Sequence, residues 1–184
     1  MKAFITLVMG FLISVGASAN DFAAAIGFRS NSADIAIPNA TGVSVKSKTG
    51  FGGGVLGFFD MTQSIQMRTG LLYNQRDVKI DDGVTDYDMN AGYVDIPVTA
   101  NFKFADYAGF FAGPVLALLA QKDNKLGNSK DPEAMSVAFQ LGASFKFAPQ
   151  LGAELFYEVM PSEYWDKTLK NLKTVGANLL ITFE

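Results

Sequence analysis

The chain has 184 residues, a formal net charge of −3 at pH 7, and neither cysteine nor histidine. Its slightly acidic balance lacks the basic footprint of nucleic-acid-binding proteins, so we expect no nucleic-acid partner. The absence of cysteine excludes a disulfide-stapled domain, and the absence of both residue types excludes Ser-His and Cys-His nucleophiles. After the first segment, no run approaches the roughly eighteen apolar residues of a membrane-spanning helix.

The first nineteen residues have the pattern of an export signal. An early lysine is followed by an apolar run, and the small residues Ala17 and Ala19 precede Asn20. This order is typical of a secretory signal peptide with its cleavage site. The apolar run is also short for a helix that must span about 30 Å. We therefore predict that residues 1–19 are removed and that residues 20–184 form one domain.

Eight later segments alternate with the period of two that β-strands show. The connections between them alternate between long polar loops and tight turns. Outer-membrane barrels have this layout, with long loops outside the cell and short turns in the periplasm. An even number of strands then places both termini in the periplasm. The predicted connections are 31–48, 61–63, 77–91, 105–107, 122–134, 148–149 and 161–172.

Six of the eight segments have one apolar face and one face that carries every formal charge. A charge that faces lipid costs up to about 2–4 kcal/mol at mid-depth, so we predict that the apolar face contacts lipid and the charged face lines the lumen. Segments 50–59 and 108–121 show the alternation less clearly, but the ring must close to satisfy its backbone groups. The predicted lumen charges are Arg29, Arg68, Asp95, Lys103, Lys146, Glu154 and Glu158.

Aromatic residues gather near the strand ends, as they do at the two interfaces of a membrane barrel. The girdle expected on the periplasmic side consists of Phe22, Phe58, Phe59, Phe102, Phe104, Tyr107, Phe110, Phe111, Phe145, Phe147 and Phe183. The opposite girdle is expected to begin with Phe28, Phe51, Tyr73 and Tyr157.

Several short motifs on these strands resemble those of the PorT-like outer-membrane β-barrel domain, within the OmpA/OmpX-like architecture. They are Gly50-Phe51 leading to Gly57, Leu71-Leu72-Tyr73-Asn74-Gln75, Tyr93-Val94-Asp95-Ile96-Pro97 and Gly109-Phe110-Phe111-Ala112-Gly113-Pro114. The resemblance implies an all-β fold, an eight-stranded antiparallel transmembrane β-barrel in a bacterial outer membrane. Such barrels commonly end on an aromatic residue that the barrel-insertion machinery reads. Here Phe183 is that residue, although Glu184 follows it.

Two carboxylates on one strand, Glu154 and Glu158, raise the possibility of acid–base chemistry. Lysine and arginine side chains face the same lumen, however, and charges of both signs in a narrow interior usually pair. We therefore interpret these residues as a structural network and predict that the chain is not an enzyme and holds no cofactor.

The connection 77–91 is rich in aspartate, and hard cations such as calcium or magnesium prefer oxygen ligands. The spacing does not match an EF-hand loop, so a metal site is only a weak candidate. A divalent cation could also bridge this connection to lipopolysaccharide phosphates. The residues concerned are Asp81, Asp82, Asp86 and Asp88.

Pro97 and Pro114 fall on neighbouring predicted strands, where each removes a backbone donor. If the turn centres near residues 105 and 106, the two prolines lie roughly opposite each other. They indicate either a shared bulge or a local gap in the barrel wall through which a lipid or small apolar ligand could enter.

Three functions remain open from the sequence. The leading one is a non-catalytic outer-membrane protein whose long loops contact outside partners, with outer-membrane lipid and lipopolysaccharide around the barrel. The second is a narrow pore or solute conduit through the charged lumen. The third is a barrel that binds a lipid or another small ligand.

Overall fold

The computed structural model describes residues 21–35, 43–81, 83, 85–124, 132–161 and 169–183. Within these ranges no helix is long and apolar enough to cross a bilayer. The predicted signal peptide lies outside them. The described elements are the strands β1 (Asp21–Ile35), β2 (Ser44–Asp60), β3 (Ile65–Gln75), β4 (Val78–Asp81), β5 (Asp86–Ala105), β6 (Ala108–Asn124), β7 (Met135–Ala148), β8 (Leu151–Met160) and β9 (Leu169–Phe183).

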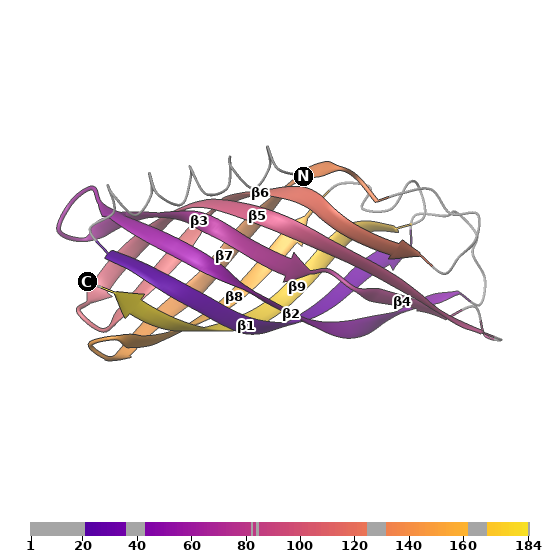
Figure 1. Cartoon of the computed structure of the whole chain (residues 1–184), viewed down its shortest axis with the longest axis horizontal. Helices are drawn as coiled ribbons and strands as arrows, with labels where there is room; N and C mark the ends of the chain where they lie inside the picture. The colour runs from indigo at the N-terminus through magenta and orange to yellow at the C-terminus, as the bar shows by residue number, and fades with distance from the viewer. Residues whose placement is uncertain are drawn as a thin grey trace.

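The strands form one closed antiparallel ring (Figure 1). Apart from β3 and β4, strands that follow each other in the chain pair with each other, and β1 pairs with β9 to close the ring. The short strand β4 pairs with β2 and β5, as β3 does, so β3 and β4 together occupy one position. The ring therefore has eight strand positions, which confirms the predicted eight-stranded antiparallel barrel.

The line along which β1 meets β9 is called the seam here. Its register runs from the pair Phe22 and Phe183 at one end to Ile35 and Leu169 at the other. The rings of Phe22 and Phe183 stack with their centroids 5.3 Å apart. At the opposite end, Lys173 Nζ lies 3.0 Å from a carboxylate oxygen of Asp34.

Tight turns occupy one end of the barrel, at residues 61–64, 106–107 and 149–150. Strand β1 begins and β9 ends at this same end (Figure 1). We call it the turn end and the opposite one the loop end. The positions of the tight turns confirm the short connections predicted from the sequence.

The predicted long connections are partly wrong, because much of their length is strand. Strand β1 continues to Ile35 and β2 begins at Ser44, inside the predicted loop 31–48. The predicted loop 77–91 forms a hairpin of β4 and β5 around residues 82–85. In the other two long connections, β6 extends to Asn124 and β9 begins at Leu169.

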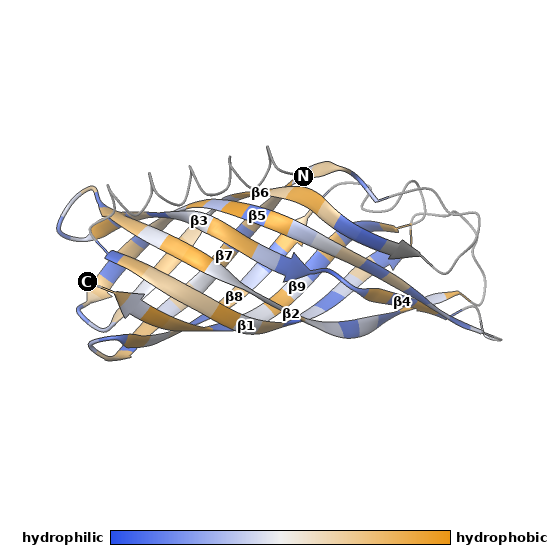
Figure 2. Cartoon of the chain, in the orientation of Figure 1, coloured by the Kyte–Doolittle hydropathy of each residue, from blue (hydrophilic) through white to orange (hydrophobic). Residues whose placement is uncertain are grey.

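The middle of the barrel is apolar outside and polar inside, as the strand patterns predict. Leu155 and Ile26 are more than half exposed on the outside, whereas Arg68 and Glu154 are fully buried inside. Apolar stretches, coloured orange, recur on the strands of this part of the barrel (Figure 2). The two unclear segments follow the same rule: Phe51 and Phe110 are exposed, while Leu56 and Phe111 are buried. We call this part the belt section.

Beyond the belt, at the loop end, the polarity is reversed. There Val78, Ile80 and Met89 point inward and are buried. The outward positions of the same strands carry lysine and aspartate, including Lys46 and Lys79. We call this part the outer section; it comprises residues 32–35, 44–48, 78–81, 86–90, 121–124 and 169–173.

Candidate functional site

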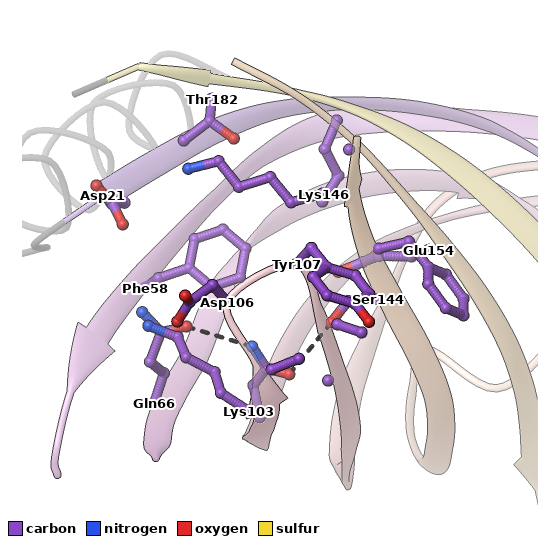
Figure 3. Close-up of a pocket in the computed structure, with 17 residues that line it drawn as sticks. Asp21, Phe58, Gln66, Lys103, Asp106, Tyr107, Ser144, Lys146, Glu154 and Thr182 are labelled. Atoms are coloured by element: carbon purple, nitrogen blue, oxygen red, sulfur yellow. Dashed lines mark hydrogen bonds between the residues drawn. The ribbon is translucent and has the colours of Figure 1, made fainter. Parts of the chain in front are cut away.

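The lumen opens at the turn end into a cavity of about 150 Å³ (Figure 3). Lys103, Lys146 and Ser144 line its wall, and Glu154 lies at its inner limit. A chain of hydrogen bonds crosses it: Asn101 donates to Gln66 Oε1 at 3.3 Å, and Ser144 donates to Asn101 Oδ1 at 3.4 Å. Further in, charged side chains occupy the interior.

Arg68 of β3 and Glu154 of β8 form the innermost contact seen from this cavity. The arginine donates from Nε and from Nη2 to the two carboxylate oxygens, each at 2.8 Å. Asn178 donates to the same carboxylate at 3.1 Å, and Arg68 Nη1 also donates to Gln140 Oε1 at 3.3 Å. This two-pronged geometry is the strong form of an arginine–carboxylate bond.

A second ion-pair group lies nearer the loop end and is centred on Arg76. Its guanidinium donates to both oxygens of Asp95 at 2.7 Å and to Glu158 Oε1 at 2.6 Å. Asn74 donates a further short hydrogen bond to Asp95. Gln140 links the two groups, because its Nε2 donates to Glu158 at 3.2 Å.

Arg76 is a residue that the sequence analysis missed. It stands at the junction of β3 and β4, just before the segment interpreted as a loop. Its position continues the inward series of Arg68, Leu72 and Asn74, because residues two apart on a strand share a face. Extending that parity by one step would have placed Arg76 in the lumen.

The third buried arginine, Arg29, has no direct ion pair among the described residues. Its Nη2 lies 3.4 Å from Asn178 Oδ1, and its Nη1 has no hydrogen-bond partner. Three arginines and three carboxylates thus share the interior. A lone charge in this environment costs far more than a paired one, so the balance of signs makes the network tolerable. Its members are Arg29, Arg68, Arg76, Asp95, Glu154 and Glu158.

Aromatic rings flank each of these arginines. The Arg68 guanidinium carbon lies 4.7 Å from the centre of the Phe111 ring, and that of Arg29 lies 5.3 Å from the Phe156 ring. A Cβ on Gly142 would collide with Phe111, so this glycine leaves the space in which the ring lies. The sequence analysis assigned Phe111 to the aromatic girdle on the periplasmic side, which is wrong, since its side chain is buried in the lumen.

Besides Phe111, two further aromatic rings lie beside arginines in the lumen. A Cβ on Gly176 would collide with the Phe156 ring that flanks Arg29. Arg76 lies over Tyr93, with its guanidinium carbon 5.1 Å from the ring centre. Cations over aromatic faces are stabilised, the more so where water is excluded.

The two lysines predicted for the lumen do not join the buried network. Lys103 lies at the turn end, where its Nζ is 3.5 Å from Asp60. Lys146 is exposed at the rim of the cavity. The structure therefore brings together Arg29, Arg68, Asp95, Glu154 and Glu158 and leaves the two lysines at the entrance.

Above the network, an apolar cluster fills the lumen toward the loop end. We call it the apolar plug. Met89, Tyr93 and Met160 are its largest inward side chains, and each is fully buried. The plug consists of Ala33, Val78, Ile80, Met89, Ala91, Tyr93, Val115, Ala117, Ala138, Met160, Leu169 and Leu172.

The two prolines lie in the wall between β5 and β6. Pro97 is opposite Val115, not Pro114, and the register resumes at Ala100 and Ala112. Between these pairs the ladder is interrupted. The backbones nevertheless stay close, because a Cβ on Gly113 would lie 2.5 Å from the carbonyl oxygen of Val98. An opening for a ligand at this point stays a prediction.

The aspartates considered for a metal face outward on the outer section. Lys46 Nζ lies 2.6 Å from Asp81 and 3.4 Å from Asp86, and Lys48 Nζ lies 3.1 Å from Asp88. Among the described residues, no group of three or more potential ligands is placed to hold a metal ion. Asp82 lies outside the described residues.

The closed ring, its apolar belt and its charged interior define a small membrane β-barrel. Residues 11–159 match the outer membrane protein beta-barrel domain family, and the chain belongs to this family. The family places the chain in the bacterial outer membrane and confirms the resemblance found in the sequence. No curated protein sequence matches the chain.

Solved structures share the fold at low sequence identity. Ail of Yersinia pestis, in complex with the heparin analogue sucrose octasulfate, is 15% identical with a TM-score of 0.52; the match covers 89% of this chain and 98% of Ail. Neisserial surface protein A is 13% identical with a TM-score of 0.54, over 88% of this chain and 97% of that protein. These likenesses support the barrel architecture.

Proposed function

We propose that the chain is a non-catalytic, non-conducting outer-membrane barrel that presents a surface for binding at its loop end. The observation that carries this proposal is the filled lumen. From Arg68 to Leu172, the interior is occupied first by paired charges and then by the apolar plug. Eight strands usually enclose just enough room for side chains, which fits this arrangement.

The lumen carboxylates are poorly suited to catalysis. Glu154 accepts hydrogen bonds from Arg68 and Asn178, and Glu158 accepts them from Arg76 and Gln140. A general acid or base must be free to exchange a proton with a substrate that reaches it. Both carboxylates are instead fully buried and hydrogen-bonded to the protein.

The outer section supports the surface role. It extends the barrel beyond the apolar belt on strands that have their own packed interior. A rigid scaffold that carries variable connections is a common way to build a binding surface. Ail, a barrel of the same fold, was solved in complex with a polar ligand, the heparin analogue sucrose octasulfate.

Single-channel conductance of refolded residues 20–184 in a planar bilayer tests the closed lumen. Folding is first verified by the heat-dependent shift in gel mobility. We expect no discrete openings. A Tyr93→Ala/Met160→Ala variant thins the apolar plug and provides the matched control, in which brief openings are expected. Reproducible openings of the unaltered barrel would favour the narrow pore instead.

Cysteine labelling of whole cells tests the orientation. The chain has no cysteine, so a single introduced thiol is unambiguous. With the loop end outside, a membrane-impermeant maleimide labels Ser44→Cys and leaves Thr62→Cys, in a tight turn, unlabelled until the cells are lysed. The opposite pattern would refute the proposed orientation.

The proposal includes export and insertion as the sequence predicts them. Removal of residues 1–19 would deliver the chain to the periplasm. Phe183 is exposed at the end of β9, and in the closed barrel its ring stacks on that of Phe22. Before the seam closes, the Phe183 ring has no such contact and is available to the insertion machinery.

A further inference from the structure

A second cavity, of about 240 Å³, lies on the outside of the barrel wall near the loop end. We call it the wall pocket. It spans four strand positions, from β2 across β3 and β5 to β6. Its lining residues are Lys48, Tyr73, Gln75, Asp77, Asn90, Ala91, Gly92 and Gln121.

The wall pocket lies at the level where the outward side chains change from apolar to polar. On β3 the outward series runs from Leu71 through Tyr73 to Gln75. On β5 it runs from Val94 to Asn90. In a membrane barrel this change, with an aromatic residue at the border, marks the level of the lipid headgroups.

The lining of the wall pocket offers hydrogen-bond donors that suit neutral oxygen groups of a ligand. Three side-chain amide oxygens are already occupied: that of Gln75 accepts from the Phe51 backbone at 3.3 Å, that of Asn90 from Lys48 at 2.7 Å, and that of Gln121 from the Tyr73 hydroxyl at 3.5 Å. The amide NH₂ ends make no hydrogen bond to other described residues, so each can donate to a ligand.

Asp77 supplies the acceptor. It stands at the junction between β3 and β4, and its carboxylate accepts a backbone hydrogen bond from Ala91. Burial raises the pKa of Asp77 above its ordinary value, although the positive charge of Lys48 and the backbone hydrogen bond from Ala91 act in the opposite direction. A hydroxyl group that donates to this carboxylate would replace the missing solvation.

Tyr73 forms the floor of the pocket on the membrane side. A Cβ on Gly92 would collide with its ring, so the glycine allows the ring to lie across β5. Sugar rings have an apolar face and a rim of hydroxyls, and an aromatic ring beside amide and carboxylate groups matches both.

An anionic headgroup fits less well. Lys48 is the only cation among the lining residues, and its ammonium group is bound to Asp88 at 3.1 Å and to Asn90. A phosphate in the pocket would also lie close to the Asp77 carboxylate. We infer that the wall pocket binds the saccharide headgroup of a glycolipid in the membrane leaflet at the loop end.

This inference rests on the proposed orientation only for the question of which membrane leaflet supplies the glycolipid. Native mass spectrometry of the refolded barrel in detergent micelles tests the pocket itself, whichever way the barrel faces. The probes are a dihexosyl diacylglycerol, a phosphatidylglycerol with the same acyl chains, and the free disaccharide. If the proposed orientation is wrong, the cysteine labelling shows it. If the wall pocket does not bind a glycolipid, the mass spectrometry shows it.

We expect the barrel to retain one glycolipid under conditions that strip phosphatidylglycerol. Asn90→Leu/Gln121→Leu removes two donors and should lower retention about tenfold, the loss expected for roughly 1.4 kcal/mol of binding. Ser30→Leu is the matched control, because Ser30 is an exposed residue of β1 that does not line the wall pocket. This variant should retain the lipid.

Asp77→Asn keeps the shape of the pocket but removes the carboxylate acceptor, and it carries the test if the double variant does not fold. A several-fold loss of glycolipid is expected from it. Equal retention of both lipids, or full retention by the folded variants, would overturn the inference. Binding of the free disaccharide at the same concentration as the glycolipid would also overturn it, since the site would then serve a soluble sugar.

Discussion

The belt section and the outer section share the strands β1, β2, β5, β6 and β9, yet their interiors and exteriors have opposite polarity. In the belt, Leu155 faces outward and Glu154 inward. In the outer section, Lys79 faces outward and Ile80 inward. The strands stay paired antiparallel through both sections, with β4 in place of β3 and with register shifts between Ser32 and Asp34 and between Gly92 and Tyr93. The difference shows that the surrounding solvent, lipid or water, decides which face of a strand must be apolar.

The two sections also hold their interiors together by different means. The belt interior depends on hydrogen-bonded ion pairs, such as Arg68 with Glu154. The outer interior depends on packing of side chains such as Met89 and Leu172. Substitutions with the same chemistry should therefore have different effects in the two sections.

The largest effect is expected from breaking a belt ion pair on one side. Arg68→Leu leaves Glu154 buried without its partner and should lower the free energy of unfolding by about 3–5 kcal/mol. Replacing both residues by leucine removes the unpaired charge and should restore most of this loss. Urea unfolding in lipid vesicles, followed by gel mobility, measures both variants. Equal losses in the single and double variants would contradict the assigned role of the pair.

The next largest difference between the two sections is expected in the loss of unfolding free energy when a leucine is truncated to alanine. Leu172→Ala leaves a cavity in the packed outer section and should cost about 2–5 kcal/mol. Leu155→Ala on the belt exterior should cost only about 1–2 kcal/mol, because lipid chains fill the space and only the transfer of the side chain from water to an apolar environment is lost. The same unfolding experiment compares them, and a larger loss for Leu155→Ala would refute the assignment of the two exteriors.

Addition of a charge to the exterior should cost more in the belt section than in the outer section, the reverse of the leucine truncations. Leu155→Arg places a cation against lipid and should cost about 2–4 kcal/mol near mid-depth. Ser44→Arg on the exterior of the outer section meets water and should stay within about 0.5 kcal/mol of the unaltered chain. Partition between folded membrane-inserted and unfolded protein gives both values. A comparable penalty at Ser44 would mean that lipid extends over the outer section.

The smallest effect concerns the ion pair at the loop end of the seam. The hydrogen bond from Lys173 lowers the pKa of Asp34 below its ordinary value of 3.8, and Asn171 adds a second bond. The pair therefore contributes stability at neutral pH that is lost as the pH falls through the lowered pKa. Because the pair is exposed, this contribution should be below about 1 kcal/mol.

A titration of the Asp34 carboxyl carbon by nuclear magnetic resonance measures this pKa directly. Lys173→Met should raise it toward the ordinary value, whereas Lys170→Met, on the same strand, should change it little. An unchanged pKa in Lys173→Met would show that the bond does not form in the membrane-inserted barrel.

The belt section was predictable from the sequence because its strands obey one rule over their whole length. Residues two apart share a face, so the apolar series through Leu155 and the charged series through Glu154 could be separated by counting. The partners could not be predicted. That Arg68 meets Glu154 across the lumen, while Lys146 stays at the rim, depends on strand tilt and depth.

The outer section was misread for a physical reason. Asp81, Asp86 and Lys79 make the region look like a surface loop, since strands in lipid carry no such outward charges. The alternation of Val78 and Ile80 with these residues is instead that of a strand with water outside. A search for strands with an apolar inner face as well as strands with an apolar outer face would have predicted the hairpin of β4 and β5. It would also have predicted the position of Arg76.

The seam joins the first and last strands of the chain, from the stacked rings of Phe22 and Phe183 to the bond between Asp34 and Lys173. Every other neighbouring pair of strand positions is adjacent in sequence and can form as a local hairpin. The seam instead closes a loop of nearly the whole chain, the most expensive kind of contact to reach during folding. Ring closure is thus expected to be the slow step of assembly, and until it occurs β1 and β9 are open edges in the membrane that another chain could pair with.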